Sequence, residues 1–116
     1  MAATLQLQVL GNARALIADP ANWTSHTPAR AADGRPAAWY GRHAVRWCAL
    51  GAIYRAAYDL IGSEKQAERI GKKVAALVCP PRFWFLKRSL PYMNDAYGHA
   101  AILRAFDKAL LGVGGG

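Results

Sequence analysis

Three kinds of side chain in this sequence could together perform thiol chemistry. Cys48 supplies a nucleophile, His99 a general base, and Asp95 or Asp107 a carboxylate that orients the imidazole; these are the groups that a cysteine hydrolase needs. A catalytic thiol usually lies at a helix N-terminus, where the helix dipole lowers its pKa. The apolar residues around Cys48 instead predict a position one turn or more inside a buried helix, where burial raises the pKa. We therefore interpret Cys48 as an inert packing residue and keep a hydrolase built on Cys48, His99 and Asp95 as the weaker alternative.

The same residue types do not predict a metal site. The candidate ligands are Cys48, Cys79, His26, His43 and His99. No two of them have the C-x2-C or H-x3-H spacing that structural zinc sites use. The sequence therefore predicts neither a metal centre nor a bound cofactor.

Positive charge is concentrated in the middle of the chain. The net charge is +8, of which residues 65–88 contribute +6. Lysine and arginine side chains bind phosphates, and each contact makes the affinity more dependent on salt. The cations of this segment are Lys65, Arg69, Lys72, Lys73, Arg82, Lys87 and Arg88. They predict binding of nucleic acid or another acidic partner, and the alternative is a solvated helix face.

Three consecutive aromatic residues lie inside this basic segment. Phe83, Trp84 and Phe85 could stack on unpaired bases, enter a membrane interface or contact a protein partner. Alternatively, they fill part of the core. No helix-turn-helix, zinc-finger or RNA-recognition motif accompanies them, so the sequence leaves these alternatives open.

The apolar spacing predicts an all-α fold of about four helices. We expect helices over residues 5–18, 43–61, 64–78 and 96–111. The helix over 43–61 is apolar on most of its circumference, so the other helices should surround it. Gly62 should end this central helix, and Ser63 should begin the next one through a capping box with Gln66.

The connection over residues 24–41 is expected to be either an ordered loop or a small β-hairpin. Asp33-Gly34 indicates a turn. The stretches 28–32 and 35–39 on either side of this turn could pair as two short strands. The sequence does not choose between the loop and the hairpin.

Several polar and small residues are assigned structural roles. They are Trp47, Cys48, Gly51, Asn94, Asp95, His99 and Asp107. Gly51 would let a neighbouring element approach the central helix, and Asn94 or Asp95 would cap the last helix. His99 is interpreted as a core histidine with a hydrogen-bond partner. A partly buried Asp107 needs a counter-charge, for which Arg14 and Arg46 are the candidates.

Composition predicts a single helical domain over residues 1–111 and a glycine-rich tail, 112–116, that frays. Hydrophobic residues make up 53% of the 116 residues and charged residues 19%, which favours a folded core over disorder. No apolar run has the ~18 residues of a membrane-spanning helix, and no signal peptide is recognisable. Two cysteines suit a reducing compartment, so we expect a cytoplasmic protein. The sequence does not indicate whether the protein forms a homo-oligomer.

Three parts of the sequence together resemble a known family. The residues are Ala15-Leu16-Ile17 with Pro20 and Trp23, then Trp47-Cys48-Ala49-x-Gly51-Ala52, then Asn94-Asp95 with His99-Ala100-x-x-Leu103-x-x-x-Asp107-x-Ala109. This pattern resembles a family of small proteins from bacteria, notably actinobacteria, and their phages, which is catalogued as a domain of unknown function. The chain departs from it at Met93, where the family often has Trp, and in a longer basic stretch over 63–91. The resemblance implies a shared fold and a bacterial or phage origin, and it implies no activity.

The leading hypothesis is therefore a non-enzymatic binding or accessory protein that engages nucleic acid or another acidic partner through residues 65–88. The second hypothesis is an interaction or phage-assembly component, or a host-interfering protein, that uses the aromatic segment 82–88. A hydrolase based on Cys48 and His99 is third.

Overall fold

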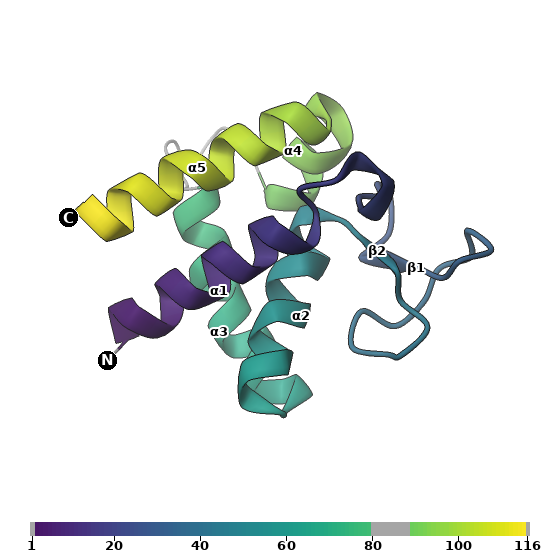
Figure 1. Cartoon of the computed structure of the whole chain (residues 1–116), viewed down its shortest axis with the longest axis horizontal. Helices are drawn as coiled ribbons and strands as arrows, with labels where there is room; N and C mark the ends of the chain where they lie inside the picture. Colours follow the sequence, from purple (N-terminus) through teal and green to yellow (C-terminus); the bar gives the residue numbers. More distant parts are fainter. Residues whose placement is uncertain (1, 80–88, 116) are drawn as a thin grey trace.

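The computed structural model describes residues 2–79 and 89–115, which form five α-helices and one two-stranded ladder (Figure 1). In chain order the elements are α1 (Ala2–Leu16), the 3-10 helix η1 (Pro20–Asn22), β1 (Ala29–Arg30), β2 (Arg46–Trp47), α2 (Ala49–Ile61), α3 (Glu64–Val78), α4 (Leu90–Tyr97) and α5 (His99–Gly115). The predicted all-α fold with a small β element is confirmed. Among the described residues, no helix is long and apolar enough to cross a membrane.

α2 is the central helix, as predicted, but it begins at Ala49 and not at residue 43. It packs against α1, α3 and α4. Its buried residues are Ala49, Gly51, Ala52, Ile53, Ala56 and Ala57, and most of these are small enough for neighbouring backbones to approach. Residues 46–47 form β2 instead of a helical turn, because apolar spacing cannot distinguish a strand of two residues from a turn of helix.

α3 has the predicted limits, and local signals set its start. Gly62 ends α2 in the left-handed region with φ of 83°, a conformation that glycine adopts without a steric penalty. The Ser63 hydroxyl then accepts a hydrogen bond from the Gln66 N–H and caps α3. Ala67, Gly71, Val74 and Val78 form the buried face of the helix.

The C-terminal region differs from the prediction of one helix capped by Asn94 or Asp95. Ser89 caps α4 through the Tyr92 N–H, and Asn94 and Asp95 lie inside that helix. Gly98, with φ of 87°, separates α4 from α5. α5 extends into residues 112–116, and the fraying of this segment stays a prediction.

β1 pairs mainly with β2 and only slightly with the expected hairpin partner. The antiparallel register places Ala29 opposite Trp47 and Arg30 opposite Arg46. Around the predicted turn, Arg30 forms a single bridge to Pro36. The hairpin over 28–39 is therefore present but minimal, and the ladder to β2 fixes the loop onto the N-terminus of α2.

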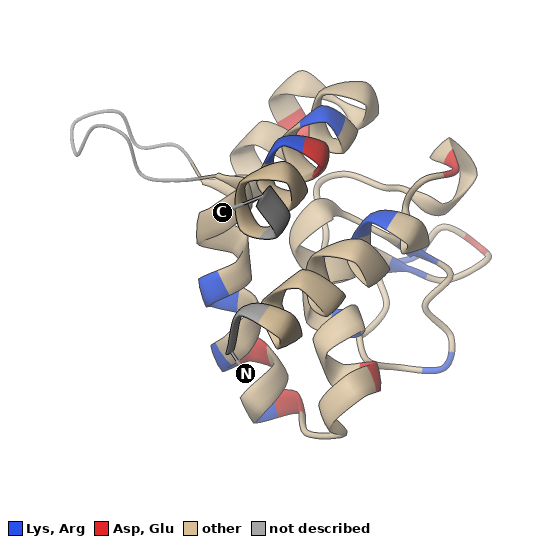
Figure 2. Ribbon diagram, turned by 60° about the vertical axis from the view of Figure 1, so that its left-hand side comes forward, with Lys and Arg blue, Asp and Glu red and all other residues tan. Residues whose placement is uncertain are grey.

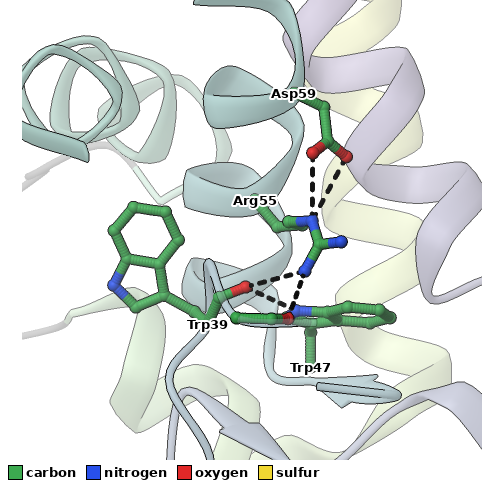
Figure 3. A network of polar contacts seen from close by, with 5 residues as sticks. Trp39, Trp47, Arg55 and Asp59 are labelled. Carbon is green, nitrogen blue, oxygen red and sulfur yellow. Dashed lines mark hydrogen bonds and ion pairs between the residues drawn. The ribbon is translucent and has the colours of Figure 1, made fainter. Parts of the chain in front are cut away.

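Arg55 anchors the long connection to α2 (Figure 3). Its Nη1 donates to the carbonyl oxygens of Trp39 and Gly41, at 3.3 and 2.9 Å. Its Nε donates to Asp59 at 3.0 Å, and the guanidinium lies 5.4 Å from the centre of the Trp47 ring. The Trp39 carbonyl also accepts from Trp47 Nε1. One arginine therefore holds segment 39–41 and the Trp47 ring together.

Candidate functional site

Cys48 lies at the N-terminus of α2, not inside a helix as predicted. Its backbone is extended, with φ of −76° and ψ of 174°, because the residue follows β2 directly. The Sγ atom accepts a hydrogen bond from the Gly51 N–H at 3.3 Å. The residue is only 5% exposed. Burial raises the pKa of the Cys48 thiol, and the hydrogen bonds from the Gly51 and Leu50 N–H groups offset this only in part.

Asn94 is fully buried and joins four other residues. Its Oδ1 accepts from Trp23 Nε1 at 2.7 Å and from the Ala49 N–H at 2.9 Å. Its Nδ2 donates to the Thr24 carbonyl at 3.0 Å and to Asp95 Oδ1 at 3.1 Å. Asn94 therefore satisfies the first amide of α2, a helix 45 residues earlier in the chain. Asn94 therefore binds a helix N-terminus, as expected of a cap residue, but this helix is α2 and not the last helix.

Asp95 faces the loop before β1. Its Oδ1 accepts a hydrogen bond from the His26 N–H at 2.9 Å, where His26 has a positive φ of 69°. Burial alone would raise the pKa of the Asp95 carboxyl, but the hydrogen bonds from the His26 N–H and the Asn94 amide outweigh it and lower the pKa. This carboxylate holds a strained backbone residue in place.

His99 contacts the Trp23 ring and the backbone at the end of α1. Its Nε2 lies 2.6 Å from the Ile17 carbonyl oxygen, and its ring centre is 5.6 Å from that of Trp23. Among the described residues, Cys48, Asp95 and His99 each form their hydrogen bonds with other groups and not with one another. The structure therefore does not assemble them into a nucleophile–base–carboxylate arrangement.

Asp107 pairs with Arg14, one of the two partners predicted for it, through Nε–Oδ1 at 2.5 Å. Its side chain is 51% exposed, which agrees with the expected partial burial. Within residues 2–79 and 89–115, no group of three or more His, Cys, Asp or Glu side chains is placed to hold a metal ion.

The strongest candidate site is the basic face of α3, formed by Lys65, Arg69, Lys72 and Lys73. All four side chains are exposed, on the side of α3 opposite its buried residues. In Figure 2, blue segments follow one another along this helix, which precedes the grey segment, with red segments between them.

None of these four cations is paired within the part of the chain that the structure describes. The ion pairs there join Arg14 to Asp107, Arg35 to Asp33 and Arg55 to Asp59. Arg82, Lys87 and Arg88, predicted to extend the basic site, and Phe83, Trp84 and Phe85, predicted to contact a partner, lie outside the described residues.

Together, these features define a small helical protein with a two-stranded ladder. Within the described residues, its buried polar side chains are hydrogen-bonded and the basic face of α3 has no ion pair. The sequence matches the family of unknown function DUF6197 over residues 1–110, and the chain belongs to that family. The expected kinship with a family of unknown function is confirmed. No curated protein and no solved structure matches the chain.

Proposed function

We propose that this chain is a non-enzymatic accessory protein of bacterial or phage origin that binds nucleic acid through the basic face of α3. One observation carries the proposal: four exposed cations lie on one helix face, and no described carboxylate pairs with any of them. Cations that the fold does not use remain available for phosphates.

The geometry of the basic face suits contact with a nucleic acid backbone. Lys65 to Lys73 spans about 12 Å along the helix, which limits the site to a few phosphates. Glu64 and Glu68 lie on the same helix. The Glu64 carboxylate interacts with the Tyr40 hydroxyl, and its charge raises the pKa of that hydroxyl. Lysine and arginine contacts to phosphates carry no sequence information, so we expect binding that is independent of base sequence.

Fluorescence anisotropy with short duplex and single-stranded oligonucleotides tests the proposal. With four phosphate contacts, log K should fall against log [salt] with a slope of about −3 to −4. A double variant, Arg69→Gln with Lys73→Gln, should reduce the magnitude of this slope by about 2 and weaken binding at low salt.

The matched control is Arg104→Gln with Lys108→Gln. These two residues are exposed, lie on α5 and have the same types and spacing as Arg69 and Lys73. Equal losses in both double variants would mean that net charge and not the basic face governs binding, which would contradict the proposal. Absence of binding at low salt would also contradict it and would favour a protein partner, including one that docks on residues 82–88.

A further inference from the structure

Two arginines lie directly opposite each other on the β1–β2 ladder. The register pairs Arg30 with Arg46, next to the pair of Ala29 with Trp47. Ala29 is fully buried and Trp47 is 8% exposed, so their face packs on the core. Because successive side chains alternate between faces, Arg30 and Arg46 share the outer face, with Cβ atoms about 5 Å apart.

Neither arginine is paired with a carboxylate in the described part of the chain. Like charges directly opposite one another destabilise a ladder. Arg30 donates to three neutral oxygens: Thr24 Oγ1 at 2.7 Å, the Gly34 carbonyl at 2.8 Å and the Ser25 carbonyl at 3.1 Å. Arg46 donates from Nε to the Ala21 carbonyl at 3.2 Å.

These contacts hold the Arg30 guanidinium at three points and the Arg46 guanidinium at one, and they leave donors unused. A guanidinium carries five N–H groups, so in the described structure two remain on Arg30 and four on Arg46. Fixed arginines bind oxyanions at a small entropic cost. The carboxylates on adjoining segments have other partners. Asp19 accepts from the Ala21 N–H, Asp95 from the His26 N–H, and Asp33 from the Arg35 N–H.

We infer that the outer face of the ladder binds a phosphate group between Arg30 and Arg46. A phosphate monoester carries about 1.5 to 2 negative charges at neutral pH and would neutralise both arginines. A carboxylate or a phosphodiester carries only one charge. The ladder lies apart from α3 (Figure 1), so this site is independent of the basic face.

Titration followed by amide NMR tests the site, with inorganic phosphate and glycerol phosphate as probes at constant ionic strength and acetate as the comparison anion. Both phosphate probes should shift the amides of residues 24–27, 29–30 and 46–47, and acetate should bind at least tenfold more weakly. Tighter binding of glycerol phosphate than of inorganic phosphate would assign the site to an esterified phosphate, and the reverse order to free phosphate. Binding of acetate as tight as that of phosphate would overturn the inference.

Arg46→Gln is the decisive variant, because Arg46 forms one described hydrogen bond whereas Arg30 forms three that hold the loop. Phosphate affinity should fall about tenfold or more, and Arg46→Lys, which keeps the charge but not the planar fork, should recover part of it. Arg42→Gln, an exposed cation of the same connection, should change the affinity less than twofold.

The Arg69→Gln, Lys73→Gln protein should bind phosphate like the wild type, so failure of the nucleic acid proposal and failure of this one are distinguishable. Unchanged phosphate affinity in a folded Arg46→Gln protein would overturn the inference. It would mean that the two arginines only hold the loop in place.

Discussion

The polar groups around the N-terminus of α2 are hydrogen-bonded within the fold, whereas the cations on α3 are exposed and have no described ion pair. Around α2, Asn94 binds Trp23, Thr24 and the first amide of the helix, and Asp95 binds the loop at His26. Among the described residues, no buried side-chain nitrogen or oxygen lacks a hydrogen-bond partner. On α3, four cations are exposed and have no described ion pair.

This difference shows that residue type is a poor guide to function when burial is unknown. A buried polar group costs free energy unless it is hydrogen-bonded, so the fold itself accounts for Asn94, Cys48 and His99. An exposed charge contributes little to the stability of the fold. Stability therefore does not explain why α3 carries four exposed cations. Hydrogen bonding within the fold therefore accounts for the catalytic residue types, and we propose the less specific basic residues as the functional candidates.

Removal of the Asn94 amide should have the largest effect on stability. Asn94→Ala leaves Trp23 Nε1, the Ala49 N–H and the Thr24 carbonyl without this partner. We expect the free energy of unfolding to fall by about 3–5 kcal/mol in urea titrations. Asn12→Ala, at an exposed position of α1, should cost no more than about 0.5 kcal/mol. A similar small loss at Asn94 would remove the proposed contrast between the two regions.

A methyl group at Gly51 should have the next largest effect. A Cβ there would lie 2.0 Å from the Pro28 carbonyl oxygen, so the backbone before β1 would have to move. We expect Gly51→Ala to cost about 2–3 kcal/mol.

Gly11→Ala provides a control of opposite sign for Gly51→Ala. A Cβ at Gly11 would have nothing within 4 Å, and alanine should stabilise α1 by about 0.5–1 kcal/mol. Thermal unfolding of both proteins measures the difference, and a neutral Gly51→Ala would mean that α2 and residue 28 are not in close contact.

The Cys48 thiol should give a smaller effect that depends on pH. Burial raises its pKa above the ordinary value of 9.0. The stabilisation linked to this shift is fully present below the unfolded pKa and is lost as pH rises through the folded pKa. Wild-type stability should therefore fall more steeply than that of Cys48→Ser between neutral pH and about pH 10.

Comparison of the wild type with Cys48→Ser subtracts the contribution of Tyr40, whose pKa is raised mainly by Glu64. The pKa of Tyr54 is raised first by burial and also by the Cys48 charge, so the difference between the two proteins reports Cys48 together with its coupling to Tyr54. In a Cys79→Ser background, where Cys48 is the remaining cysteine, native protein should react with iodoacetamide far more slowly than unfolded protein. Rapid reaction of native protein at neutral pH would show an activated thiol and would return the hydrolase hypothesis to consideration.

Neutralising the basic face should have the smallest effect on stability. Arg69→Gln with Lys73→Gln should change the free energy of unfolding by less than about 0.5 kcal/mol, while its effect on oligonucleotide binding is large. A loss of stability comparable to that of Asn94→Ala would show that the cations support the fold. The contrast between the two regions would then be wrong.

Local signals in the sequence predicted part of the fold well. The end of α2 and the start of α3 follow from Gly62 and Ser63, and the pairing of Asp107 with Arg14 was one of two predicted choices. The start of α2 was missed because β2 depends on pairing with residues 29–30, far away in the sequence. Asn94 was assigned to the wrong helix because its partners, Trp23 and Ala49, are brought to it only by folding.

The helical class, the central position of α2, the limits of α3 and the concentration of positive charge can all be predicted from the amino-acid sequence. These properties depend on residues close together in the chain, through apolar period, capping groups and composition. Three other features cannot be predicted without the folded structure: Cys48 lies at a buried helix N-terminus, Asn94 joins three segments, and Arg30 faces Arg46. Each of these features depends on which backbone groups, distant in the sequence, become neighbours in the fold. Buried polar groups must be hydrogen-bonded, and their partners are defined only when the whole chain has packed.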